Sequence, residues 1–269
     1  MKTAMQVMEL ARHKGRPCFA DWVSLIFDDF FPLCGDRCYG DDEALQGGIA
    51  LLSGRPVTVV GHAKGNNTKT NIKHNFGMPH PEGYRKALRL MHQAEKFRRP
   101  VITLVDTPGA FCGVEAEERG QGEAIARNLM EMMSLNTPIL SVFTGEGGSG
   151  GALGLAVSDQ AYMLENAVYS VISPRGCASI LWNDAAREAE AAEKLKITAH
   201  DLLSLKVIDT ILPEPPGGAH KNPRAAADTI KSALLAGLLW ADTQEDLRPR
   251  RYNRFRSMGQ YLEGTSDAL

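Results

Sequence analysis

Residues 138–151 read PILSVFTGEGGSGG, an apolar run that leads into five glycines within seven positions. The run at 139–143 is typical of a strand that is buried on both faces of a parallel sheet. An equivalent run at 101–105, VITLV, leads directly into the turn DTPGA at 106–110. Two buried strands in alternation with helical patterns predict an α/β fold with a mainly parallel sheet.

Further strands and helices are expected on both sides of these two strands. Apolar residues recur at helical spacing from Tyr84 to Ala94, which predicts a helix over 81–97. Thr198 and Asp201 form a capping box that predicts the start of another helix. The other expected elements are a hairpin over 49–61, strands at 162–164, 168–172 and 207–212, and helices over 115–134, 185–196, 223–239 and from the glycines to about 158. We expect few regular elements before residue 42 and a polar loop over 64–81.

The composition is that of an ordinary soluble protein. Of the 269 residues, 43% are hydrophobic and 23% are charged. No apolar run approaches the roughly 18 residues that a membrane span needs, and the first residues do not resemble a signal peptide. The net charge of -2 gives no field of the kind that attracts nucleic acid. We expect a single domain over 1–269, with an N-terminal extension over about 1–45 and a basic C-terminal tail over about 244–269.

The cysteines indicate a reducing compartment. There are 5 of them at irregular spacing, which argues against a disulfide framework and favours a cytoplasmic location. Cys34 and Cys38 lie four positions apart, but no second pair of Cys or His follows at the spacing of a zinc site. We therefore expect no metal on this chain.

The glycine-rich turn is the candidate functional site, because open α/β sheets bind ligands where such turns follow parallel strands. Three mechanisms fit it. The first is dinucleotide binding, since Gly145, Gly147 and Gly150 match G-x-G-x-x-G and Glu165 lies near the end of the next strand. That match is weak, because five glycines in seven positions satisfy many templates.

The second mechanism is a nucleophilic serine, as in a hydrolase or thioesterase. Residues 147–151, GGSGG, match G-x-S-x-G with Ser149 as the nucleophile. Asp201 or Asp209, followed by His220, would complete the triad. No motif surrounds the histidines, which weakens this hypothesis.

The third mechanism uses the backbone alone. Glycines let the chain approach a ligand closely, and N–H groups at a helix N-terminus stabilise an oxyanion. Because the turn at 106–110 follows the neighbouring strand, two turns that present amides would line one site. The structural alternative is that the glycines only permit tight packing of helix against strand.

Long strings of the sequence resemble the alpha subunits of bacterial acetyl-CoA carboxylase carboxyltransferase, and the resemblance covers nearly the whole chain. These strings are far more specific than any spacing of glycines. They are NIK at 71–73, NFGMPHPEGYRKA at 75–87, DTPGA at 106–110, AEERGQ at 116–121, GEGGSGGAL at 145–153, GCASILW at 176–182 and PEP at 213–215.

The resemblance implies a crotonase-like fold of stacked β-β-α units. It implies transfer of a carboxyl group from carboxybiotin, held on a separate biotin carboxyl carrier protein, to acetyl-CoA, which gives malonyl-CoA for fatty-acid synthesis. The family's alpha subunit pairs with a zinc-ribbon-bearing beta subunit in an α2β2 assembly, which works with biotin carboxylase in the full complex. Carboxyltransferases that act on another acyl-CoA are the nearest alternative.

The resemblance also implies site residues. The backbone N–H groups of Gly150 and Gly151 would form the oxyanion hole for the biotin ureido oxygen, and Ser149 would be only a turn residue. The residues implied on the carboxybiotin side are Gly109, Ala110, Gly147 and Gly148.

Two basic segments are candidates for contacts with ligands or partners. Arg85, Lys86 and Arg89 form a helix face that could contact CoA phosphates or an acidic carrier protein, although most such faces are merely solvated. The segment RPRRYNRFR at 248–256 could contact nucleic acid or CoA, but the favoured prediction is a terminal arm that packs on the partner subunit.

The chain departs from the family's usual pattern at three places. Asn66 and Asn67 stand where Arg-Asp is usual, Cys112 stands where Pro is usual, and Arg175 stands where Glu is usual. These departures bear on fine positioning and partner contacts more than on the reaction.

Overall fold

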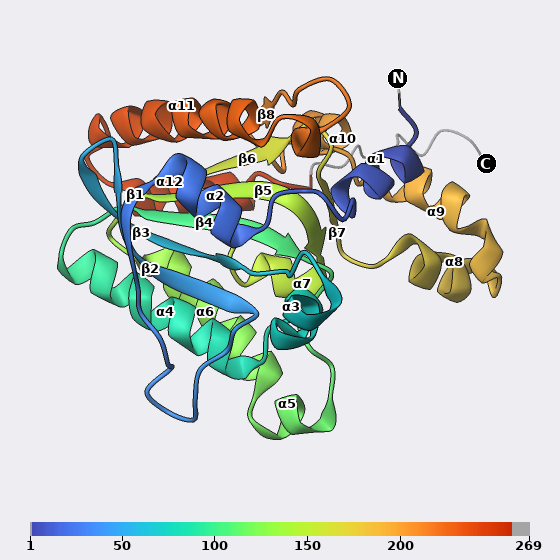
Figure 1. Ribbon diagram of the computed structural model, residues 1–269, viewed down its shortest axis with the longest axis horizontal. Helices are drawn as coiled ribbons and strands as arrows, with labels where there is room; N and C mark the ends of the chain where they lie inside the picture. Colours follow the sequence, from blue (N-terminus) through green and yellow to red (C-terminus); the bar gives the residue numbers. More distant parts are fainter. Residues whose placement is uncertain (1, 260–269) are drawn as a thin grey trace, which may run out of the picture.

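The computed structural model describes residues 2–259, which form one mixed sheet with helices on both faces (Figure 1). The strands are β1 Asp28–Pro32, β2 Leu45–Leu52, β3 Arg55–His62, β4 Val101–Thr107, β5 Ile139–Gly148, β6 Gln160–Leu164, β7 Val168–Ser170 and β8 Thr210–Leu212. Their order is β1-β2-β3-β4-β5-β6-β8, with β7 paired to the end of β5. Pairing is parallel from β3 onward and antiparallel among β1, β2 and β3.

The helices cover the sheet in two layers. They are α1 Ala4–Ala11, α2 Phe19–Ile26, α3 Thr68–Lys73, α4 Pro81–Lys96, α5 Val114–Glu118, α6 Gln121–Ser134, α7 Ser149–Leu153, α8 Pro174–Trp182, α9 Glu188–Leu195, α10 Ala199–Ser204, α11 Pro223–Asp242 and α12 Leu247–Arg256, with short 3-10 turns at Asn75–Gly77, Ala185–Arg187 and Ala219–Lys221. In Figure 1, α4 and α6 lie below the sheet, and α2 and α11 lie on the other side. Helices α8 and α9 project at one end.

The strongest sequence patterns give the elements that were expected. All residues of β4 are buried, as are the first nine of β5, because helices cover both faces of these strands. The hairpin of β2 and β3 turns at Ser53 and Gly54, whose φ angles of 50° and 82° suit the tight turns of two-residue hairpins. Helix α4 buries Tyr84 and Met91, as its apolar periodicity predicts.

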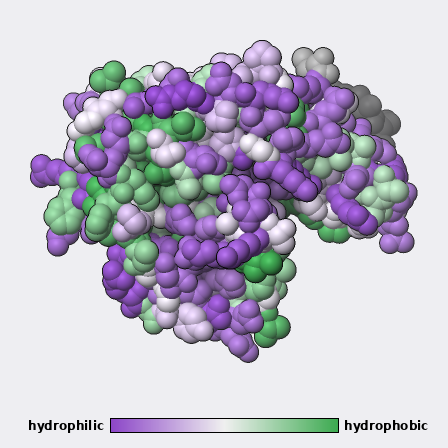
Figure 2. All heavy atoms as spheres, viewed as in Figure 1, coloured by the Kyte–Doolittle hydropathy of each residue, from purple (hydrophilic) through white to green (hydrophobic). Residues whose placement is uncertain are grey.

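The expectation of few regular elements before residue 42 is wrong. Helix α2 buries Trp22 and Ile26 in the main core, and β1 extends the sheet beside β2. Apolar residues of α2 and β1 also line a cavity of about 370 Å³. Figure 2 shows hydrophobic residues gathered over this part of an otherwise mainly hydrophilic face. What was expected as an extension therefore includes part of the sheet and core.

Three other expectations need correction. The helix over 115–134 is two helices, because Gly120 has a φ of 82° between α5 and α6. The polar loop over 64–81 contains α3, which Asn67 caps by accepting a hydrogen bond from the N–H of Thr70 at 3.0 Å. Helix α8 was not expected as a helix, and Ser173 caps its first turn.

The basic C-terminal segment forms α12 and packs on its own chain. Arg251 is fully buried and donates to both carboxylate oxygens of Asp159, at 3.0 and 2.8 Å. It also donates to three backbone carbonyls, one in the last turn of α6 and two between α6 and β5. Helix α12 is therefore fixed to its own chain through Arg251, and its packing on a partner subunit stays a prediction; residues 260–269 of the predicted tail lie outside the described part of the chain.

Candidate functional site

The two turns predicted to share a site lie against each other. In the parallel pairing of β4 with β5, Thr107 is opposite Gly147. A Cβ atom at Gly148 would lie 2.1 Å from the carbonyl oxygen of Pro108, and one at Gly151 would lie 2.4 Å from the nitrogen of Ala110. Real Cβ atoms do not approach so closely, so glycine at both positions permits backbone-to-backbone contact between the turns.

The glycine-rich segment forms regular secondary structure where its sequence predicts a loop. Its first four residues continue β5, which bends away to pair with β7. The left-handed conformation occurs at Ser149, whose φ is 52°, and not at Gly150 or Gly151. A non-glycine residue in this region is uncommon and marks a sharp, strained turn. Helix α7 begins at this serine.

Gly150 lines a cavity at the start of α7. The cavity has a volume of about 260 Å³, and most of its walls are apolar, among them Leu153, Leu195 and Val207. A Cβ at Gly150 would have only Ile125 near it, at 4.0 Å. The N–H groups of Gly150 and Gly151 have no acceptor among residues 2–259, as expected for the first turn of a helix without a capping side chain.

The turn at 106–110, which contacts the glycine-rich segment, also leaves open space beside one of its glycines. Gly109 has a φ of 151°, which side-chain-bearing residues rarely adopt, and a Cβ there would meet nothing within 4 Å. Its N–H donates to the hydroxyl of Thr107 at 3.0 Å, which holds the turn at the end of β4. There is therefore open space beside the backbone at Gly109 and at Gly150, whereas Gly148 and Gly151 are needed for the close packing of the two turns.

A network of ion pairs holds the backbone at the ends of β4 and β5. This network was not predicted from the sequence. Asp106 accepts hydrogen bonds from the N–H of Glu146 at 2.8 Å and from the ammonium of Lys64 at 2.6 Å. Glu146 in turn accepts from Arg12 at 3.0 Å and lies 3.7 Å from Lys64. The carboxylate of Asp106 thus fixes the backbone where the glycines begin. These four residues come from four separate segments, so no local pattern could have joined them.

Two buried side chains meet at the backbone of α7. The hydroxyl of Tyr84 donates to the carbonyl oxygen of Gly151 at 3.1 Å, and Nε2 of His62 lies 3.2 Å from the same oxygen. Burial lowers the pKa of His62 to about 4, so its ring is neutral near pH 7. Contact with a carbonyl then requires the hydrogen on Nε2.

The shifted pKa of His62 predicts a stability that falls in acid. An unfolded histidine has a pKa near 6.5, so below that pH the unfolded chain binds a proton that the folded chain does not. We expect this residue to lower the free energy of unfolding by up to about 3 kcal/mol as the pH falls from about 6.5 to about 4. Urea unfolding of the wild type and of His62→Gln at pH 7 and pH 4.5 measures the difference. Equal pH dependence in both proteins would contradict the assignment.

The basic face predicted on α4 is occupied within the chain. Lys86 is buried, donating to the carbonyl of Asp42 at 2.8 Å and forming an ion pair with Asp41. The guanidinium of Arg85 donates to Asp36 at 2.8 Å, and Arg89 donates to backbone carbonyls of the same loop. These cations hold the loop before β2 in place, which corrects the prediction of a free basic surface for CoA or a carrier protein.

The structure does not bring together the residues that the two alternative mechanisms require. His220 stacks on His13, with ring centroids 3.8 Å apart, and Asp209 pairs with Arg254, so neither meets Ser149. Thr198 caps α10 by accepting from the N–H of Asp201, and its hydroxyl donates to the carboxylate of Asp201 at 2.7 Å. The dinucleotide motif fails as well, because Gly145 and Gly147 lie inside a strand instead of a turn that opens a helix.

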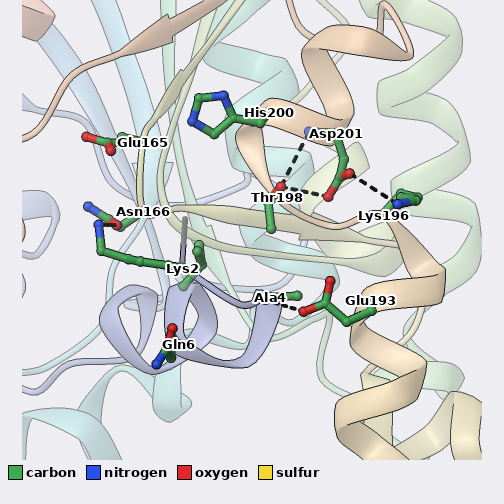
Figure 3. Close-up of a pocket in the computed structure, with 11 residues that line it drawn as sticks. Lys2, Ala4, Gln6, Glu165, Asn166, Glu193, Lys196, Thr198, His200 and Asp201 are labelled. Carbon is green, nitrogen blue, oxygen red and sulfur yellow. Dashed lines mark hydrogen bonds and ion pairs between the residues drawn. The ribbon is translucent and has the colours of Figure 1, made fainter.

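A third cavity, of about 640 Å³, lies between α1, α9 and α10 (Figure 3). Among its polar side chains, Lys2 donates to Asn166 at 2.8 Å, and Glu193 accepts from the backbone N–H of Ala4 at 2.8 Å. Glu165 and Asp201, candidates of the two alternative mechanisms, line it, but no residue of the two glycine turns does. No group of three or more potential metal ligands occurs within residues 2–259, and no helix of this part is long and apolar enough to cross a membrane.

The topology and the paired glycine turns define a crotonase-like protein. The chain aligns over 98% of its length with transcarboxylase 12S, a structure solved with methylmalonyl-coenzyme A bound, at a TM-score of 0.69 and 16% identity. The alignment spans 47% of that longer chain. At this identity the likeness concerns the fold.

Sequence comparison places the chain more narrowly. A family model described as acetyl co-enzyme A carboxylase carboxyltransferase-like matches residues 2–259, and the chain belongs to this family. It is 57% identical over 261 residues to the acetyl-coenzyme A carboxylase carboxyl transferase subunit alpha of Clostridium perfringens, covering 96% of each chain. It is 57% identical over 258 residues to the subunit of that name from Escherichia coli, covering 95% of this chain and 81% of the relative.

Proposed function

We propose that this chain is the alpha subunit of an acetyl-CoA carboxylase carboxyltransferase and that it forms the carboxybiotin side of the active site. One observation supports the site above others. Gly150 lines an apolar cavity, and the N–H groups of Gly150 and Gly151 lack protein acceptors in the described chain. The identity to the carboxyl transferase subunits, which extends over nearly the whole chain, supports the activity.

The chain's own groups fit a biotin ring that carries a carboxyl group. When bound, carboxybiotin supplies the carboxyl group and a ureido oxygen on which negative charge develops during transfer. The two glycine N–H groups donate to that oxygen, as in other oxyanion holes, where the loss of one donor costs roughly 10²–10³ in rate. The apolar walls of the cavity, which include Leu195 and Leu202, lower the local polarity and strengthen these hydrogen bonds.

Other expected residues take supporting roles in this proposal. Gly109 and Ala110 form the turn that contacts the glycine-rich segment, and Gly147 and Gly148 bring β5 close to that turn, so that in the proposal both turns serve one ligand. Ser149 sets the bend that presents the amides and is not a nucleophile. No side-chain base is required on this chain, because the biotin nitrogen can accept the proton of the acetyl group.

The same proposal gives the partners. A zinc-ribbon beta subunit supplies most of the acetyl-CoA site in an α2β2 assembly, a biotin carboxyl carrier protein delivers carboxybiotin, and biotin carboxylase regenerates it. The free state of all five cysteines within this chain is compatible with a cytoplasmic enzyme.

The reverse reaction tests the proposal. The chain is co-purified with the beta subunit of its own host, and the biocytin-dependent conversion of malonyl-CoA to acetyl-CoA is measured. We expect turnover that requires biocytin and that is at least about tenfold faster with malonyl-CoA than with methylmalonyl-CoA, because extra bulk in a fitted pocket is rejected by about this factor or more. A preference for methylmalonyl-CoA would assign another acyl-CoA, and the absence of biocytin-dependent turnover would refute the function.

A further inference from the structure

The carbonyl oxygen of Gly151 receives two side-chain donors from distant parts of the chain. Tyr84 reaches it from α4, and His62 reaches it from the end of β3. Tyr84 is 0% exposed and His62 is 1% exposed, so neither donor is shared with solvent. Burying a polar group costs free energy unless the group is hydrogen-bonded. Both buried side chains meet this requirement through the same carbonyl oxygen.

The same carbonyl has no backbone donor, which makes the side chains decisive. In a longer helix it would accept from the N–H of Leu155, but that N–H donates to Ala152, and the N–H of Gly154 donates to Gly150. Helix α7 is only five residues long and ends in a tighter turn. Without Tyr84 and His62, the carbonyl would be buried with no partner among the described residues.

Both donors keep their hydrogens over the working pH range. Burial raises the pKa of Tyr84 well above its ordinary value, so the phenol is neutral. His62 is neutral as well, and its Nδ1 has no hydrogen-bond partner in the described chain, which leaves the Nε2 hydrogen for Gly151. The two contacts are therefore constant hydrogen bonds and not a titrating switch near pH 7.

We propose that Tyr84 and His62 are positioning residues for carboxyl transfer: by holding the carbonyl of Gly151 they fix the direction of the neighbouring N–H groups that form the oxyanion hole. This inference rests on the function proposed above. The peptide at Gly151 is held on one side by these donors and on the other by the turn at Ala110, 2.4 Å from where its Cβ would lie. A displacement of about 1 Å in such a site can cost about 10² in rate.

The role predicts a split between kcat and KM. The N–H groups act on charge that is larger in the transition state than in the bound substrate, so loosening them lowers kcat and leaves KM nearly unchanged. Tyr84→Phe removes one hydroxyl and keeps the ring, and we expect kcat of the reverse reaction to fall about five- to tenfold, as for one buried hydrogen bond.

A matched control separates positioning from loss of stability. Tyr162 is also buried, and its hydroxyl bonds to Gln160 beside α11, away from the glycine turns. Tyr162→Phe therefore removes an equivalent group, and we expect it to keep the kcat of the wild type. Thermal unfolding of both variants within the complex shows whether they are destabilised alike.

Variants of His62 provide an independent test of the positioning role. His62→Leu removes the donor, whereas His62→Gln can place an amide N–H near the position of Nε2, so we expect a loss of kcat with leucine and substantial rescue with glutamine. The inference is overturned if Tyr84→Phe and Tyr162→Phe have equal kcat, or if glutamine and leucine at position 62 are equally impaired. A wild-type complex without biocytin-dependent turnover would instead overturn the proposed function, before any variant is compared.

Discussion

Gly151→Val is expected to lower carboxyl transfer by the reconstituted complex at least 10²-fold, to or below the limit of detection. A Cβ at this position would lie 2.4 Å from the nitrogen of Ala110 and 2.5 Å from the carbonyl carbon of Gly109. Both are backbone atoms, so no rotation of a side chain can relieve the contact. Valine also adds two methyl groups, and the turns must separate, which displaces the amides of the oxyanion hole. Loss of one such donor alone costs roughly 10²–10³ in rate.

The measurement is kcat of the biocytin-dependent reverse reaction, with two controls. Gly122 lies in α6, and a Cβ there meets nothing within 4 Å, so Gly122→Val introduces the same side chain without a clash. Ser149→Ala removes a hydroxyl that makes no hydrogen bond in the described chain, and we expect a mild effect. Circular dichroism and recovery of the beta subunit establish that each variant folds and assembles. Loss of activity in Ser149→Ala with activity retained in Gly151→Val would contradict the backbone mechanism.

The sequence predicts the framework of the site well. The apolar runs of β4 and β5 are short and continuous, as expected for buried strands, and parallel strands bring their following turns to the same edge of a sheet. The meeting of the turns at Gly109 and Gly151 follows from that rule alone. The periodicity of α4 likewise predicts that Tyr84 faces the core.

The details of the site depend on contacts that no local pattern contains. The glycines suggest a left-handed turn, but Ser149 adopts that conformation, and the glycines serve the close approach of two chain segments. Lys86 looks like a solvated cation until the loop that carries Asp41 folds over it. The hydroxyl of Tyr84 gains its role only because a short helix leaves one carbonyl unpaired. Each of these outcomes results from tertiary packing overriding local propensity.

The chain purified without a beta subunit is expected to show no carboxyl transfer, at least 10³-fold below the complex. The proposed reaction develops negative charge at two places, the ureido oxygen of biotin and the thioester oxygen of acetyl-CoA. In the proposed site, the N–H groups of Gly150 and Gly151 stabilise one of these charges, whereas the N–H of Gly109 already donates to Thr107. In the proposal the beta subunit supplies the donors for the second charge, and oxyanion holes contribute too much of the rate for one to be omitted.

The surface near the cavity supports this dependence on a partner. Val171 lines the cavity and is 76% exposed, and on α8 Ile180 and Leu181 are 74% and 63% exposed. Exposed apolar residues of this size favour association, so we also expect the isolated chain to self-associate in sedimentation experiments. The assay compares biocytin-dependent loss of malonyl-CoA with the chain alone and after addition of the beta subunit, once mass spectrometry has excluded the expression host's own beta subunit. Robust turnover by the chain alone would mean that both charges are stabilised by its own groups, and the shared site would have to be abandoned.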